Sequence, residues 1–194
     1  MKGKNNIVTI NKLEGIGLMR LYQFPTVNLI SIEELLCDST EINMDLSIRL
    51  SPKQTSNTRN VFQPSIHNIR EKKVISDFVL KYSSDFNVFA HRTVEPELIG
   101  TASRYSTFYA SSLYMDTYKD WGKRAKQLVH NSMIVPVYGN RFLLSAIEMK
   151  HDSEVDRKAF LEVFSHLRKI PFETYNVEFA FEKGILAFSE LTID

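Results

Sequence analysis

The chain has 194 residues and a net charge of +1, with 43% hydrophobic and 24% charged residues. This composition excludes an intrinsically disordered chain, and the single cysteine, Cys37, excludes an intrachain disulfide and a zinc site built from cysteines. The sequence contains no stretch of about 18 apolar residues, so we expect a soluble protein of a reducing compartment, a cytoplasm or a virion, with no membrane partner.

The first 50 residues are predicted to form a strand-rich unit. Residues 7–10, "IVTI", have the composition of a strand, and Gly15 and Gly17 indicate a turn or bulge after it. Residues 42–50 alternate apolar and polar side chains, which predicts a strand with one buried face.

A long polar loop is predicted at residues 51–65, where Ser, Thr, Asn, Gln and two prolines cluster. Loops of this length in small domains are usually mobile or functional. We therefore expect a boundary here between an N-terminal unit, 1–50, and a main domain, 66–194. The alternative is one continuous domain.

Four segments are predicted to be helical. The sequence "SIEE" has capping-box spacing and predicts a short helix at 32–37. Apolar residues recur every three or four positions in the segments 71–82, 103–129 and 154–169, and Pro171 follows the last of them. Each of these three helices would bury one apolar stripe.

Two hairpins are predicted in the last third of the chain. Residues 133–149 contain two apolar runs joined by a Gly-Asn pair, and residues 177–191 contain two runs joined by a Lys-Gly pair. Helices mixed with hairpins, without regular strand-helix-strand alternation, indicate an α+β fold. Its sheet would be mostly antiparallel, with amphipathic helices packed on it.

Two apolar runs, "FAHRTV" and "LVHNSMI", each carry a histidine with a hydroxyl residue two positions later. They are His91 with Thr93 and His130 with Ser132. On a strand, positions i and i+2 share a face, so each pair would present an imidazole and a hydroxyl together.

This pair of motifs resembles the two His-x-Ser/Thr motifs of the 2H phosphoesterases. The resemblance implies that one imidazole acts as general base and the other as general acid, around a phosphodiester of RNA or a cyclic nucleotide, without a metal. The alternative interpretation is two ordinary strand histidines whose ring nitrogens bond to neighbours.

Positive charge is concentrated in the middle of the chain. Residues 49–126 contain thirteen Lys and Arg against seven Asp and Glu, whereas residues 141–194 contain seven basic and ten acidic residues. Cations around an aromatic ring can hold single-stranded nucleic acid. The candidate nucleic-acid-binding residues are Arg59, Lys119, Trp121, Lys123, Arg124 and Lys126. The alternative is a solvated basic helix face.

The absence of a complete catalytic motif favours a role other than catalysis. His67, His151 and His166 do not have the spacing of metal ligands, so we expect no metal and no cofactor. The leading hypothesis is a non-enzymatic interaction or assembly protein with protein partners, and with RNA or single-stranded DNA as a possible partner of the basic middle segment. The runner-up is the 2H-like phosphodiesterase.

Overall fold

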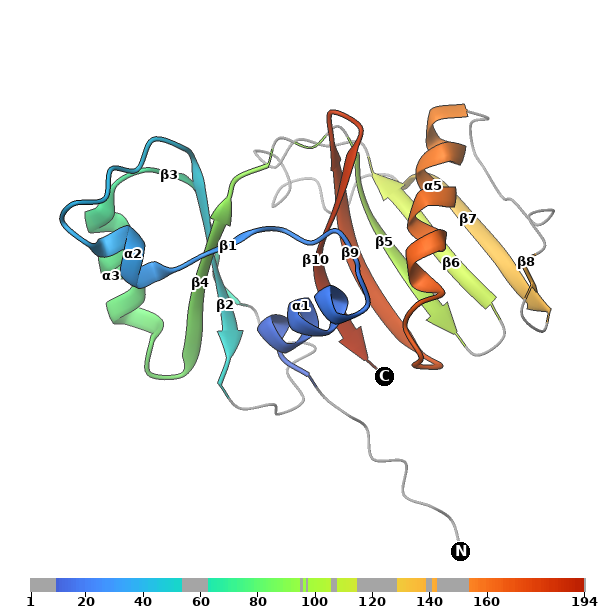
Figure 1. Ribbon diagram of the computed structural model, residues 1–194, viewed down its shortest axis with the longest axis horizontal. Coiled ribbons are helices and arrows are strands. Elements are labelled where there is room, and N and C mark those ends of the chain that lie inside the picture. The colour runs from blue at the N-terminus through green and yellow to red at the C-terminus, as the bar shows by residue number, and fades with distance from the viewer. Residues whose placement is uncertain are drawn as a thin grey trace, which may run out of the picture. The chain divides into compact units, whose positions relative to one another are not determined.

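The computed structural model describes residues 10–53, 63–94, 96, 98–105, 108–114, 129–138, 141–142 and 154–193. The chain divides into two units (Figure 1). The four-stranded unit comprises Thr9–Glu14 and Val27–Val94, and the six-stranded unit comprises Met1–Val8, Gly15–Thr26 and Glu95–Asp194. The predicted boundary at 51–65 thus falls inside the four-stranded unit.

The four-stranded unit is one antiparallel sheet with two helices on one face (Figure 1). Its strand order is β1-β4-β2-β3. The elements are β1 (Leu29–Ile30), α2 (Ile32–Leu36), β2 (Leu46–Pro52), β3 (Ile66–Ile69), α3 (Lys72–Tyr82) and β4 (Phe86–Arg92). Because β2 pairs with β4 along its whole length, residues before and after the predicted loop belong to the same sheet.

The helices α2 and α3 confirm the predicted segments 32–37 and 71–82. Ser31 caps α2 by accepting a hydrogen bond from the Glu34 backbone N–H at 3.3 Å. Both helices pack on the buried side chains of β2, the apolar residues Leu46, Ile48 and Leu50. The strand predicted at 42–50 is therefore present but begins at Leu46, and it is buried on both faces.

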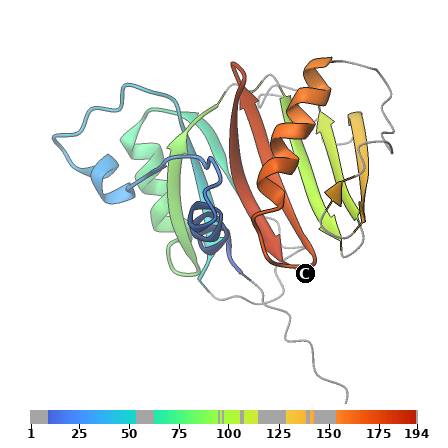
Figure 2. The same cartoon turned by 45° about the vertical axis from the view of Figure 1, so that its right-hand side comes forward.

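The six-stranded unit is a second antiparallel sheet, with the order β10-β9-β5-β6-β7-β8. Its strands are β5 (Leu98–Tyr105), β6 (Phe108–Tyr114), β7 (Val129–Tyr138), β8 (Arg141–Phe142), β9 (Tyr175–Glu182) and β10 (Ile185–Ile193). The helix α5 (Glu154–Leu167) lies across one face of this sheet in both Figure 1 and Figure 2. It confirms the helix predicted at 154–169, and the two sheets confirm the predicted α+β class.

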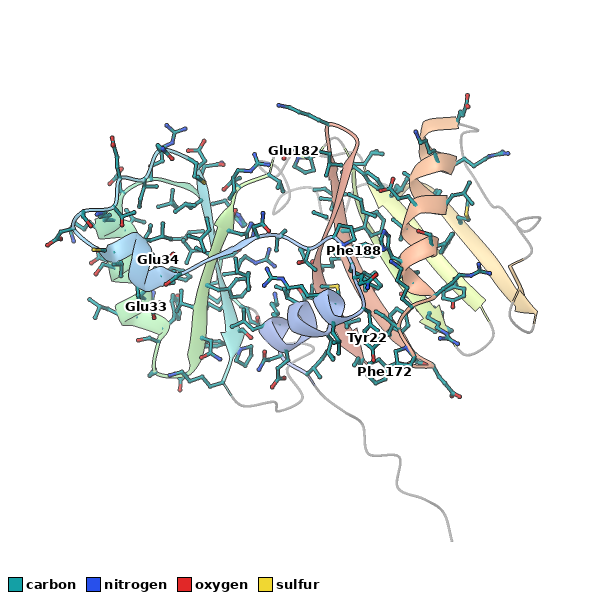
Figure 3. All side chains as sticks on the ribbon, in the orientation of Figure 1. Tyr22, Glu33, Glu34, Phe172, Glu182 and Phe188 are labelled. Atoms are coloured by element: carbon teal, nitrogen blue, oxygen red, sulfur yellow. The ribbon has the colours of Figure 1, made fainter. Side chains whose placement is uncertain are left out.

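The core of the six-stranded unit lies between its sheet and α5, and it is rich in aromatic rings. Phe164 of α5 lies over Tyr109 with ring centroids 6.1 Å apart. Phe188, labelled in Figure 3, lies 4.7 Å from Phe24 and 6.0 Å from Phe179 between ring centroids. Such tilted ring pairs each add to the stability gained from area burial.

The helix predicted at 103–129 is wrong over its described residues. Residues 103–105 end β5 and residues 108–114 form β6. In β6 the buried residues are Tyr109, Ser111 and Leu113, a period of two, because β6 pairs with β5 on one side and β7 on the other. Alanine favours a helix locally, so the pairing of β6 with both neighbouring strands overrode the local preference at Ala110. Residues 115–128 lie outside the described residues.

The hairpin predicted at 177–191 is confirmed. Lys183 and Gly184 connect β9 to β10 with φ values of 53° and 74°, the two positive φ angles of a type I′ turn. In the other predicted hairpin β7 pairs with β8, with Tyr138 opposite Arg141. Residues 139–140 and 143–149 lie outside the described residues.

The turn or bulge predicted at Gly15 and Gly17 is wrong, because both residues lie inside a helix, α1 (Lys12–Leu21). Asn11 and Glu14 cap its first turn reciprocally. The Glu14 N–H donates to Asn11 Oδ1 at 2.9 Å, and the Asn11 N–H donates to Glu14 Oε2 at 2.8 Å. Glycine is needed at position 15, because a Cβ there would lie only 2.7 Å from the carbonyl oxygen of Leu191. Close packing explains this glycine.

Among the described residues, no helix is long and apolar enough to cross a membrane.

Replacing Gly15 by alanine is expected to lower the free energy of unfolding by about 1–3 kcal/mol, because the new Cβ would collide with backbone. Gly17→Ala is the matched control. No atom lies within 4 Å of its added Cβ, so it should raise the free energy of unfolding by about 0.5–1 kcal/mol through helix propensity. Urea denaturation measures both variants, and equal effects would contradict the packing argument.

Candidate functional site

The face of the six-stranded sheet that points away from α5 carries polar side chains. On β9, alternate residues are buried on the α5 side, and the intervening ones are half-buried on the other side. We call this other side the outer face. Its β9 residues are Asn176, Glu178, Ala180 and Glu182. Figure 3 labels Glu182, which lies at the hairpin end of β9, opposite Ile185.

One row of the outer face brings two carboxylates together. Glu178 on β9 is directly opposite Glu190 on β10. On its other side Glu178 is opposite Thr101 on β5, which is itself opposite Ser112 on β6. Directly opposite residues have Cβ atoms about 4.5–5.5 Å apart, so the row places two acids beside two hydroxyls.

A β-bulge positions Glu190. The register of β10 against β9 shifts between Phe188 and Glu190, so that Ser189 and Glu190 together oppose Glu178. Without the shift, Ser189 alone would oppose Glu178 and Glu190 would point into the core beside α5. The bulge therefore places the second carboxylate on the outer face.

A divalent cation can be held by two carboxylates at opposed positions on a sheet. Mg²⁺ is commonly held by one or two protein carboxylates together with phosphate oxygens of a substrate. Within the described part of the chain, no group of three or more His, Cys, Asp or Glu could hold a metal ion. A cation at Glu178 and Glu190 would therefore need further oxygen ligands of another kind.

The neighbouring row supplies a buried acceptor. Asn176 is opposite Thr192 on β10 and Ser103 on β5. The Asn176 side-chain oxygen is buried and has no hydrogen-bond partner. Leaving such an atom unsatisfied costs about 1–3 kcal/mol.

The two His-x-Ser/Thr motifs do not come together on one sheet. His91 lies on β4 and Thr93 follows it, in the four-stranded unit, whereas His130 and Ser132 lie on β7 of the six-stranded unit. His91 is 3% exposed and its Nδ1 bonds to the Arg92 carbonyl oxygen at 2.8 Å. Burial lowers the pKa of His91. Two facing imidazoles on central strands, as the 2H resemblance implied, are not present in either sheet.

A hydrogen-bonded cluster that the sequence did not indicate surrounds Thr93. Its hydroxyl bonds to Ser47 Oγ at 2.9 Å, and Ser47 Oγ bonds to His67 Nδ1 at 2.9 Å. Burial lowers the pKa of His67 to about 4, and the charge of Arg49 adds to this effect. His67 is therefore a neutral imidazole near pH 7. The only sequence signal for it was its position beside a predicted loop.

The six candidate nucleic-acid-binding residues lie outside the described residues. They are Arg59, Lys119, Trp121, Lys123, Arg124 and Lys126. Their proposed role stays a prediction.

Solved enzyme structures share the fold. The dinucleotide-forming acetyl-coenzyme A synthetase 1 of Ca. Korarchaeum cryptofilum, in complex with coenzyme A, Ca-AMPCP and HgCl⁺, aligns with a TM-score of 0.63 at 12% identity, over 95% of this chain and 92% of that one. ACD1 of the same organism, in complex with coenzyme A, aligns with a TM-score of 0.65 at 11% identity, over 95% of this chain and 92% of that one. The ADP complex of N5-carboxyaminoimidazole ribonucleotide synthetase aligns with a TM-score of 0.53 at 12% identity, over 94% of this chain and 44% of that one.

These structures and this chain share one fold. No protein-family model matches the chain, and no curated protein matches it in sequence. The predictions of a non-enzymatic interaction or assembly protein and of a 2H-like phosphodiesterase are both wrong, because the solved structures that share the fold are those of synthetases.

His67 should make stability depend on pH. Its pKa is about 4 in the folded state and 6.5 when unperturbed, so between these values the unfolded state binds more protons. Stability that is present above pH 6.5 is then lost as the pH falls toward 4. Urea denaturation at pH 7 and pH 5 should show a smaller pH effect in His67→Asn than in the wild type. Identical pH effects would contradict the burial of a neutral His67.

Proposed function

We propose that this protein is an ATP-dependent enzyme in which Glu178 and Glu190 hold a divalent cation against the phosphates of ATP. The observation that carries the proposal is the direct opposition of these two carboxylates on the outer face of the six-stranded sheet. Oxygen-rich groups of this kind suit Mg²⁺, which keeps part of its coordination for substrate phosphates.

Enzymes with the same fold support this proposal. The acetyl-coenzyme A synthetase was solved with Ca-AMPCP, and the N5-carboxyaminoimidazole ribonucleotide synthetase was solved with ADP. Both ligands are adenine nucleotides, and one of them carries a divalent cation. At 12% identity these enzymes support the use of a nucleotide and leave the second substrate of this chain open.

The oxygen atoms that this row of the sheet presents are of the kind that bind such a cation. Glu178 and Glu190 would bind it, and the hydroxyls of Thr101 and Ser112 continue their row across β5 and β6. The bound cation would neutralise negative charge on the phosphates.

The sequence adds a reason why a cation is needed. Many phosphate-binding proteins use a glycine-rich loop whose backbone N–H groups surround the phosphates. This chain has seven glycines and no such loop, and the polar segment 51–65 contains none. Side chains and a cation held by carboxylates can make contacts to phosphate without such a loop.

Isothermal titration calorimetry with ATP tests the proposal, in MgCl₂ and in EDTA. The wild type should bind ATP more tightly with Mg²⁺ than in EDTA. Glu178→Gln and Glu190→Gln should each weaken binding in MgCl₂ by about tenfold or more, because each removes a negative charge next to the cation.

Glu182→Gln is the matched control, since Glu182 lies on the same strand and face but at the hairpin end, opposite Ile185. It should bind ATP like the wild type. The proposal fails if the wild type does not bind Mg-ATP, or if Glu182→Gln weakens binding as much as Glu178→Gln does.

A further inference from the structure

A β-bulge aims one histidine of the four-stranded unit at a hydroxyl. On β3, Ile66 is opposite Ile48 and Ile69 is opposite Leu46, so His67 and Asn68 both oppose the single residue between them on β2, Ser47. Asn68 has a φ of 59°, in the left-handed region that few residues adopt. Bulges re-aim side chains and are common beside active sites, so this departure from a regular strand points to His67.

His67 is one of four side chains in a continuous hydrogen-bonded relay. Its Nε2 bonds to Ser65 Oγ at 3.0 Å and its Nδ1 bonds to Ser47 Oγ at 2.9 Å. Ser47 Oγ then bonds to Thr93 Oγ1 at 2.9 Å, and Thr93 Oγ1 accepts a hydrogen bond from the Asn68 N–H at 3.4 Å. We name Ser65, His67, Ser47 and Thr93 the hydroxyl relay.

The order of donors along the relay depends on the tautomer of His67. In the tautomer protonated at Nδ1, the Ser65 hydroxyl donates to His67 Nε2, His67 Nδ1–H donates to Ser47, and the Ser47 hydroxyl donates to Thr93. In this arrangement the imidazole accepts a hydrogen bond from Ser65 at the exposed end of the relay. The hydroxyls of Ser47 and Thr93, at the buried end, fix its orientation. A nucleophile bonded to a base, with the base oriented by a third group, is the arrangement found in covalent catalysis.

Burial divides the relay into a fixed inner end and an accessible outer end. Ser47 is 1% exposed and Thr93 is 6% exposed, so neither can meet a substrate. Ser65 is exposed and His67 is half-buried. Ser65 Oγ is therefore the atom of the relay that an external molecule can reach.

We propose that Ser65 is a nucleophile that accepts acyl groups from small esters, with His67 as its general base. Ser65 Oγ attacks the ester carbonyl carbon while its proton moves to His67 Nε2. The bond from that carbon to the leaving oxygen then breaks, and the leaving oxygen takes the proton from His67. The products are an alcohol and an acyl-serine, which water hydrolyses to a carboxylic acid and free Ser65. This activity is independent of the proposed ATP site.

The surroundings of His67 determine how fast acyl transfer to Ser65 can be. Burial lowers the pKa of His67 to about 4, and Arg49 of β2 and His91 of β4 add to this effect. The imidazole is thus fully in its base form above about pH 5, but it is a weak base, so turnover should be slow. Covalent trapping of Ser65 is then a more sensitive readout than turnover.

A fluorophosphonate probe, which traps activated serines, tests the proposal on the full chain without nucleotide. Peptide mass spectrometry should find the adduct on Ser65 at a rate about 10²-fold above that on Ser84, an exposed serine whose hydroxyl bonds to Asp85 instead of a histidine. Ser65→Ala should remove the adduct. His67→Gln should reduce labelling of Ser65 to the Ser84 rate.

The pH profile of the wild type provides a test that does not depend on how a variant folds. Labelling of Ser65 should be nearly constant from pH 6 to pH 8, because His67 is already deprotonated, and should fall as the pH approaches 4. A rate that rises tenfold per pH unit indicates attack by hydroxide-generated alkoxide and overturns the proposal. Labelling of Ser65 no faster than Ser84 overturns it as well, and leaves the relay a purely structural cluster.

Discussion

The pairing of β9 with β10 is the constraint on which the candidate ATP site depends. It decides which side chains pack under α5 and which reach the outer face of the six-stranded sheet. Near the turn the pairing follows the two-residue connection, and beyond Phe188 it shifts by one residue. That single shift keeps Leu191 and Ile193 in the core while Glu190 joins Glu178 on the outer face, so the bulge serves packing and chemistry together.

The elements with strong local signals were predictable from the sequence. The amphipathic stripes of α3 and α5, the Lys183–Gly184 turn and the α+β class follow from periodicity and turn chemistry. The segments for which the prediction was wrong lacked such signals. In β6, Ala and Ser residues gave no decisive period, and two neighbouring strands determined its conformation. In α1, Gly15 was interpreted as a turn residue, but it lies close to the Leu191 backbone, and contacts between residues far apart in sequence leave no local pattern.

The candidate sites could not be predicted from the sequence for the same physical reason. Counting back from the turn, where Glu182 opposes Ile185, a regular hairpin would place Ser189 opposite Glu178. The bulge substitutes Glu190, and a bulge has no reliable sequence signature. His91 and His130 looked like a pair because their local motifs are alike, yet they belong to different sheets. His67, which had no motif, is the histidine that the fold surrounds with hydroxyls.

An antiparallel sheet often has one face in contact with water, and isolated glutamates on such a face need no functional explanation. The pair at Glu178 and Glu190 differs in one respect. Opposite charges or two threonines at directly opposed positions stabilise a sheet, whereas two carboxylates destabilise it. Both residues are also half-buried. This opposition, set by a bulge between the edge strand β10 and its neighbour β9, is the feature on which the proposed cation site rests.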